Sequence, residues 1–209
     1  WIMSQSEERG LRSSFYFICE KSSYLDADYV IEHPAIRHLL REIYDRGHEI
    51  GLHPSYNSFD SESQLKLEAE RLYLACKREG IKLHATGSRM HYLRWSHPAT
   101  LRYLDSAGLT YDNTLTYPDR PGFRCGTCFE YPGFDPVRGQ SLNVRVRPLV
   151  AMDVSVFGSQ YMGCNHADAL ELLAGLKEKC RKVGGCFTLL WHNSELRGRQ
   201  SLYQAVLDQ

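Results

Sequence analysis

The sequence predicts an α/β fold with a largely parallel sheet. Short apolar runs alternate with longer amphipathic segments, which is the pattern of strands joined by crossover helices. The 209 residues suit one domain with a sizeable core, so residues 1–209 are expected to form a single domain. A hydrophobic fraction of 43% and a charged fraction of 24% are those of an ordinary globular protein.

The strands are expected where apolar runs are short and rich in β-branched or aromatic residues. Residues Trp1–Arg9 resemble the last turns of a helix that leads into the first of these strands. We therefore expect an earlier strand before Trp1, so that the sequence is truncated at its N-terminus. The helix after Arg197 has no C-cap before Gln209, which predicts a second truncation there. The predicted strands are Ser14–Cys19, Glu49–His53, His84–Arg89, Thr110–Thr114, Val146–Val156 and Cys186–His192.

Four longer helices follow from a 3.6-residue apolar period. In the longest, Leu65, Ala69, Leu72 and Cys76 fall on one face, which we expect to be buried. Glycines stand where three of these helices should end, as the preference for Gly beyond a C-terminus predicts. The predicted helices are Ala35–Arg46, Ser61–Glu79, Ala99–Ala107 and Ala167–Val183.

The segment Tyr117–Leu142 has several prolines, glycines and aromatic residues and no periodicity. It is long for a connection, so it is expected to be a functional loop or lid. Cys125 and Cys128 have the spacing of a zinc or redox motif, but no second pair lies near them, so a packing role in this loop is favoured.

The charge balance of the chain argues against a nucleic-acid partner. Lys plus Arg and Asp plus Glu both number 25, so the protein has no net positive charge that would attract nucleic acid. No apolar run approaches the ~20 residues of a membrane span. The seven cysteines are scattered and odd in number, unlike a disulfide framework, which favours a reducing compartment such as the cytoplasm.

Three predicted strands end in a histidine. His53 follows Gly51-Leu52, His91 follows the strand ending at Arg89, and His192 follows Leu190-Trp191. Ligands and metals are held at the carboxyl ends of parallel strands. Packing alone does not explain three histidines at one rim, so the pattern predicts a metal-assisted hydrolase.

Five motifs resemble those of a NodB-like polysaccharide deacetylase domain, a carbohydrate esterase family four-like domain of a bacterial branch associated with surface glycans. The resemblance covers nearly the whole chain in consistent order. It implies a distorted (β/α)7 barrel, here lacking its first strand. It also implies an enzyme that removes N- or O-acetyl groups from a carbohydrate with the help of a divalent metal, with zinc as the expected ion. The motifs are residues 47–56, 89–94, 107–114, 122–128 and 189–193.

The resemblance also implies roles for single residues. The second motif of the family is a His-x-x-x-His pair that binds zinc, and here His53 matches its first histidine while Asn57 stands at the second. Asn is a poor zinc ligand. Either His91 supplies the second imidazole, or the site binds metal weakly or not at all. The first alternative is favoured, because His91 ends a neighbouring strand.

Two more roles follow from the resemblance. Arg89 matches the arginine that orients a catalytic aspartate, and His192 matches the histidine that acts as general acid, a role for which imidazole has a suitable pKa. Asp153 ends an apolar strand and is expected to orient His192 or Arg89. Asp112 is expected to have a structural role.

The acidic first motif of the family, which supplies a metal ligand and the general base, would precede Trp1. Asp26 and Asp28 follow the strand at Ser14 too late in the chain to replace it. Two other hypotheses stay open beside the deacetylase. One is a non-catalytic glycan-binding domain that has lost the metal, and the other is a hydrolase of small amides.

Overall fold

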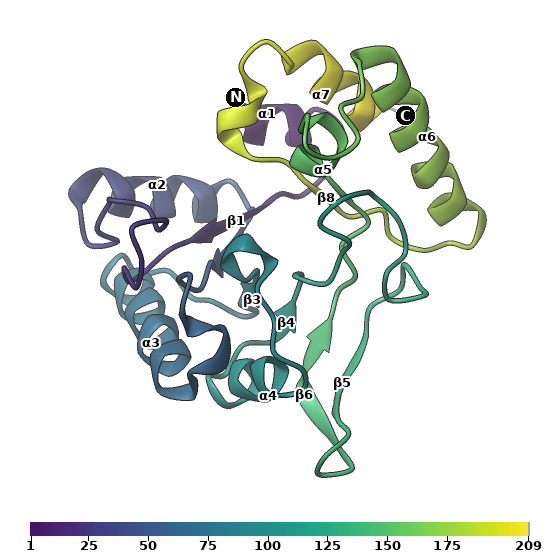
Figure 1. The fold of residues 1–209 in the computed structure, drawn as a ribbon. Coiled ribbons are helices and arrows are strands. Elements are labelled where there is room, and N and C mark those ends of the chain that lie inside the picture. The colour runs from purple at the N-terminus through teal and green to yellow at the C-terminus, as the bar shows by residue number, and fades with distance from the viewer. Residues whose placement is uncertain (209) are drawn as a thin grey trace. The chain divides into compact units, whose positions relative to one another are not determined.

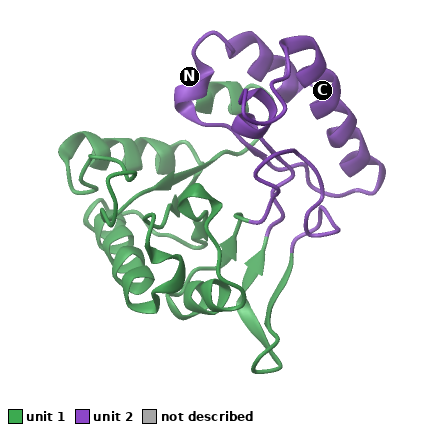
Figure 2. Ribbon diagram, in the orientation of Figure 1, with its two compact units in different colours: residues 1–114, 131–146 green, residues 115–130, 147–209 purple. Residues whose placement is uncertain are grey.

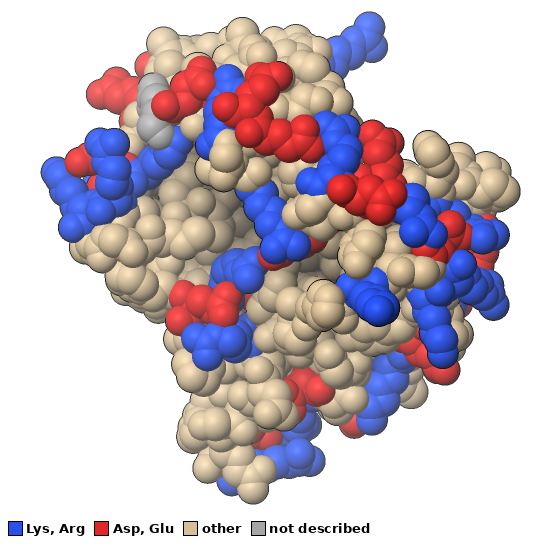
Figure 3. All heavy atoms as spheres, turned by 180° about the vertical axis from the view of Figure 1, so that it is seen from behind, with Lys and Arg blue, Asp and Glu red and all other residues tan. Residues whose placement is uncertain are grey.

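The computed structural model describes residues 1–208, which divide into two compact units (Figure 1, Figure 2). Unit 1 comprises residues 1–114 and 131–146, and unit 2 comprises residues 115–130 and the residues from 147 onward. Basic and acidic side chains are interspersed on the face that Figure 3 shows. None of the helices in residues 1–208 combines the length and apolarity needed to cross a bilayer.

Unit 1 contains a six-stranded sheet of order β1-β2-β3-β4-β6-β5. The first five strands in this order run parallel, and β5 pairs antiparallel with β6. This confirms the α/β prediction with a largely parallel sheet. The strands of unit 1 are β1 (Ser14–Phe17), β2 (Glu49–Leu52), β3 (Gly87–Ser88), β4 (Tyr111–Asp112), β5 (Tyr131–Asp135) and β6 (Gln140–Val146).

The helices of unit 1 lie close to the predicted positions. Ser61 caps α3 by accepting a hydrogen bond from the Gln64 amide at 3.3 Å, and the apolar face of α3 is buried as predicted. Gly80 follows α3 with a φ of +69°, which a residue with a Cβ adopts only with strain. The helices are α1 (Ile2–Glu7), α2 (Pro34–Asp45), α3 (Glu62–Arg78) and α4 (Ala99–Ser106), with 3₁₀ turns η1 (Ser58–Asp60) and η2 (His91–Leu93).

One face of the sheet in unit 1 depends on two glycines. A Cβ at Gly51 would lie 2.6 Å from the ring of Tyr16, and a Cβ at Gly87 would lie 2.1 Å from the ring of Tyr111. These tyrosine rings therefore occupy the space that side chains on β2 and β3 would fill. Side chains two residues apart share a face of a strand. The glycines thus make room for the two aromatic rings on the sheet.

Unit 2 is built on a parallel pair, β7 (Ala151–Met152) and β8 (Leu189–Leu190). Its helices are α5 (Asp153–Phe157), α6 (His166–Lys182) and α7 (Gln200–Asp208), with the 3₁₀ turn η3 (Asn193–Leu196). Asn165 caps α6 through a hydrogen bond from the Asp168 amide at 3.0 Å. The core of this unit contains apolar residues of β7, α5, α6 and α7, namely Ala151, Val156, Ala169, Leu173, Leu202 and Val206.

Two predictions about single segments were wrong. Tyr117–Leu142 is not one loop, because it contains β5 and the start of β6. Pro132 is tolerated since β5 is an edge strand, and the pairing is irregular between Pro132 and Phe134. The predicted strand Val146–Val156 also breaks. Asp153 starts α5 there, and its carboxylate accepts a hydrogen bond from the Val154 amide at 2.8 Å.

Candidate functional site

Two histidines meet at the carboxyl ends of neighbouring parallel strands in unit 1. His53 follows β2 directly, and its amide donates to the Phe17 carbonyl at 2.8 Å, which continues the pairing with β1. His91 opens η2 shortly after β3, and its amide donates to the Pro54 carbonyl at 3.2 Å. The two imidazole rings lie 4.9 Å apart between centroids, with an interplanar angle of 62°. The two strand ends thus present both histidines, as the sequence predicts.

Each of these rings is oriented through Nδ1. Nδ1 of His53 is in a short hydrogen bond with the backbone carbonyl of Arg89, and Nδ1 of His91 lies 2.8 Å from Oδ1 of Asp26. A carbonyl and an ionised carboxylate only accept, so both Nδ1 atoms carry the hydrogen. In the neutral rings the lone pair then lies on Nε2. Histidines that bind metals are held in this way by outer carboxylates and carbonyls.

Asp26 anchors the loop that follows β1. Its buried carboxylate accepts hydrogen bonds from the amides of Ser22, Ser23 and Tyr56 at 2.8–2.9 Å, in addition to its contact with His91. Burial opposes ionisation of this carboxyl, but the hydrogen bonds from Tyr56, Ser22 and His91 outweigh it and lower the pKa of Asp26. A buried anion is therefore in direct contact with the imidazole of His91.

Asp26 comes too late in the chain to replace the first motif, but in the structure it is the partner of His91. No local sequence pattern predicts this contact, because the two residues are 65 positions apart. The sequence predicts only a turn here, because Ser22, Ser23 and Asp26 are residues that favour turns. In the structure the Asp26 amide donates to the Ser23 carbonyl.

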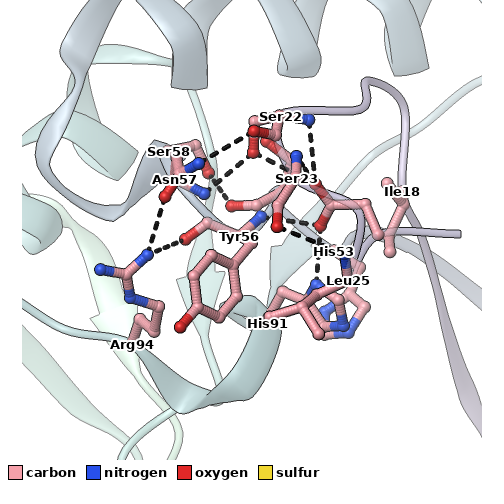
Figure 4. A network of polar contacts seen from close by, with 12 residues as sticks. Ile18, Ser22, Ser23, Leu25, His53, Tyr56, Asn57, Ser58, His91 and Arg94 are labelled. Atoms are coloured by element: carbon pink, nitrogen blue, oxygen red, sulfur yellow. Dashed lines mark hydrogen bonds and ion pairs between the residues drawn. The ribbon is translucent and has the colours of Figure 1, made fainter.

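Asn57 lies in a clamp between two loops. Its Nδ2 donates to the Ser22 carbonyl at 2.9 Å, and its Oδ1 accepts from Arg94 at 3.0 Å. The same Arg94 nitrogen donates to the Tyr56 carbonyl at 2.8 Å (Figure 4). Both polar atoms of the Asn57 side chain are thus engaged by protein groups. These contacts account for Asn57 as a structural residue and do not bring it into the His53–His91 pair.

Arg89 has a supporting place beside this pair. Its Nε donates to the Asn113 carbonyl at 3.2 Å, its guanidinium also contacts the Asn113 side chain, and it lies 4.5 Å from the ring centroid of Tyr16. Its own carbonyl accepts the hydrogen bond from His53. Arg89 therefore contributes to the orientation of His53 through its backbone.

A buried glutamate of α3 holds the loop after His53. Glu68 accepts from the Ser55 amide at 2.8 Å and from the Ser55 hydroxyl at 2.5 Å, and also from Gln64 at 3.0 Å. Burial raises the pKa of Glu68, although the hydrogen bonds from Ser55 and Gln64 act against it. Sequence reasoning missed Glu68, yet a signal was present, because it lies on the same helical face as Leu65 and Leu72.

Tyr92 is the exposed ring next to the histidine pair. It is 62% exposed, and its ring centroid lies 4.8 Å from that of His91 and 5.4 Å from that of Tyr56. Tyr92 and Leu93 have φ values of 56° and 53°. Left-handed backbone costs a residue with a side chain about 1–2 kcal/mol, so this turn is strained.

Unit 2 contains a separate histidine–carboxylate pair. Asp153 follows β7, and His192 comes shortly after β8, where the two parallel strands end. Oδ1 of Asp153 lies 2.7 Å from Nδ1 of His192, and Oδ2 accepts from the His192 amide at 2.6 Å. The expectation that Asp153 orients His192 is confirmed by these contacts. The carboxylate is buried while the imidazole is 44% exposed, so the ring presents Nε2 toward solvent.

The donor set for a metal is partly present. Two imidazoles that share one ion with bonds of about 2.1 Å have ring centres about 5 Å apart. The 4.9 Å separation of His53 and His91 fits this, and so do the acceptors on their Nδ1 atoms. Within residues 1–208, however, no group of three or more His, Cys, Asp or Glu side chains is placed to hold one ion. The pair thus fits as two ligands of a centre that needs at least one more.

Comparison with known proteins shows the fold. No family model and no curated protein matches the chain. Three solved structures match over 99% of it. A protein from Mycobacterium smegmatis assigned as a polysaccharide deacetylase has a TM-score of 0.69 at 19% identity. The allantoinase Puue has a TM-score of 0.63 at 15% identity, and a protein from Pseudomonas aeruginosa PAO1 assigned as a polysaccharide deacetylase has 0.59 at 14%.

The chain spans about two thirds of each of these structures, namely 68%, 64% and 64% of their lengths. At such identities the likeness establishes the fold. The α/β fold of the polysaccharide deacetylases, which the motifs implied, is therefore confirmed.

Proposed function

We propose that this chain, which has the polysaccharide deacetylase fold, is a metal-dependent hydrolase that removes N- or O-acetyl groups from a carbohydrate. The observation that carries the proposal is the His53–His91 pair, with each Nδ1 held by a main-chain carbonyl or a buried carboxylate. Residues that only fill a core have no need of two imidazoles arranged in this way. The likeness to proteins assigned as deacetylases supports the reaction class.

In this proposal Nε2 of His53 and Nε2 of His91 hold a divalent ion, with zinc as the first candidate because imidazole is among its preferred ligands. Such an ion supplies Lewis acidity toward an acyl carbonyl and lowers the pKa of water. Asp26 fixes the tautomer and the orientation of the His91 ring. Arg89 is a positioning residue, because its carbonyl fixes His53.

The ligand set needs at least one further protein group, and Asn57 is engaged elsewhere. The family resemblance implies a metal-binding aspartate and a general base, and the proposal takes these groups to complete the centre. Among the described residues, His53 and His91 would then be the two imidazole ligands of the metal centre.

His192 is proposed as the general acid. Asp153 accepts a hydrogen bond from Nδ1 of His192, so Nε2 is the ring atom that would carry the transferable proton. The double contact of Asp153 with the ring and the amide of His192 fixes the ring's orientation. A proton held at Nε2 suits a departing amine or alcohol, which must be protonated as the acyl bond breaks.

The test is acetate release from acetylated oligosaccharides by the protein loaded with zinc. Wild type is expected to release acetate, and His53→Ala and His192→Ala are expected to lose at least about a hundredfold in kcat/KM. His84→Ala, an exposed histidine of unit 1, is the matched control. Equal activity of His53→Ala and wild type would refute the proposal.

A second candidate function also has an observation in its favour. Because no described group of three ligands surrounds one point, a glycan-binding domain without a metal agrees with the described residues. Zinc binding separates the two candidates, since a binding domain needs no ion. Hydrolysis of a small amide, suggested by the likeness to an allantoinase, keeps the metal and is separated by the substrate alone.

A further inference from the structure

A continuous stack of rings and a guanidinium leads to the exposed Tyr92. The guanidinium of Arg94 lies 4.0 Å from the ring centroid of Phe59 and 4.2 Å from that of Tyr56. Tyr56 meets Tyr92 edge to face at 5.4 Å between centroids, and Tyr92 meets His91 edge to face at 4.8 Å. Tyr92 is thus braced by a chain of contacts, although more than half of its surface is exposed.

The roles within this stack differ. Arg94 covers one side of Tyr56 and also binds the Tyr56 carbonyl and the Asn57 side chain, so Tyr56 is held in place. Tyr92 stands at the end of the stack next to His91, and its backbone is left-handed. Glycine would adopt this backbone without strain. A large ring at this position therefore calls for an explanation other than the turn itself.

We infer that Tyr92 forms an aromatic platform that binds the apolar face of a pyranose ring and so selects a glycan as the substrate of the neighbouring histidine pair. The inference rests on the proposed function and deepens it. Aromatic rings bury large apolar areas, and a ring that is already braced loses little conformational freedom on binding. A pyranose ring has an apolar face of C–H groups and a rim of hydroxyls, which suits an exposed ring beside polar side chains.

This placement favours a glycan over a small cyclic amide. A small ligand is recognised in an enclosed pocket that buries most of its surface. A platform that is 62% exposed contributes most to a ligand that extends along the surface beyond the reacting group. Tyr92 is therefore a specificity-determining residue, while Tyr56 and Arg94 are its positioning residues.

The experiment measures binding of the tetramer of N-acetylglucosamine by isothermal titration calorimetry. Tyr92→Ala is expected to weaken binding by about tenfold, and Tyr92→Phe, which keeps the ring, to change it less than about threefold. Tyr103→Ala, on α4, is the matched control and is expected to leave the affinity unchanged.

A second variant excludes a folding defect as the cause. Tyr92→Gly relieves the left-handed strain, so its thermal midpoint is expected to equal or exceed that of wild type, while tetrasaccharide binding is weakened about as much as in Tyr92→Ala. Wild-type affinity in Tyr92→Ala and Tyr92→Gly overturns the inference, and so does a wild type that does not bind the tetrasaccharide. Zinc binding by Tyr92→Gly reports separately on the proposed function, which stands if zinc affinity is unchanged.

Discussion

The carboxylate of Asp26 lies 2.8 Å from Nδ1 of His91, although 65 positions separate the two residues in the chain. This contact joins the loop after β1 to the turn after β3. It also gives one imidazole of the histidine pair a buried anionic partner.

Replacing Asp26 tests whether this contact serves metal binding. Asp26→Asn keeps a side chain of similar size but removes the charge that holds Nδ1–H of His91. Loss of such an outer partner typically weakens metal affinity by about 10- to 100-fold. Zinc affinity, measured by competition with a chelator, should fall within this range, and Asp28→Asn is the control, since Asp28 is exposed. An affinity that stays unchanged in Asp26→Asn would show that the contact is only structural.

Asn57→Ala tests whether Asn57 holds two loops together or binds the metal. The substitution removes the hydrogen bonds to the Ser22 carbonyl and from Arg94, so unfolding should become easier by about 0.5–1.5 kcal/mol. Zinc affinity should remain that of wild type, because both polar atoms of the Asn57 side chain are engaged by Ser22 and Arg94. Urea unfolding and a zinc titration on the same preparation give both values. A variant with wild-type stability and lost zinc would reverse the assignment.

Gly87→Ala should destabilise unit 1 strongly. The new Cβ would lie 2.1 Å from the Tyr111 ring, and that ring is buried, so overpacking is expected to cost about 3 kcal/mol or more. Gly175→Ala is the matched control. It lies in α6 with no heavy atom within 4 Å of the added Cβ, so a gain of up to about 1 kcal/mol is expected. Denaturant unfolding should show opposite signs for the two variants, and equal effects would contradict the packing of Tyr111 on Gly87.

Asp112 should make stability depend on pH. Burial raises its pKa from 3.8 to about 6, although Thr114 and Ser88 donate hydrogen bonds to it. The folded chain then binds this proton more tightly than the unfolded chain does. Its contribution to stability is complete below pH about 4 and is lost as the pH rises through about 6, with a change on the order of 2–3 kcal/mol.

The measurement is the difference in unfolding free energy between wild type and Asp112→Asn from pH 4 to pH 7.5. An amide does not titrate, so the relative stability of the variant should increase as the pH rises. A difference that stays constant over this pH range would show that the pKa of Asp112 is not raised in the folded chain.

The elements that sequence reasoning located best are those with strong local signals. The apolar face of α3 and the glycine that follows it predicted that helix to within one residue at each end. The glycine-flanked run before His53 located β2 and the rim position of this histidine. Both signals lie within a few residues of the element that they specify.

The errors have physical reasons of a different kind. The hairpin of β5 and β6 has Pro132 and Gly133 at an irregular edge, where the two-residue alternation breaks, so periodicity gave no strand there. The role of Asp26 depends on a contact across 65 residues, which no local pattern contains. Glu68 was detectable as a charged residue on an apolar helical face, but only its partner Ser55 explains it.

The most direct test of the central claim is zinc binding by the wild-type chain, His53→Ala and His91→Ala, measured by elemental analysis and chelator competition. Wild type is expected to hold about one ion per chain. Each histidine variant is expected to lose more than about tenfold in affinity, while His84→Ala retains it. Absence of zinc from the wild type, or equal affinity in all three proteins, would contradict the account and favour a glycan-binding domain without a metal.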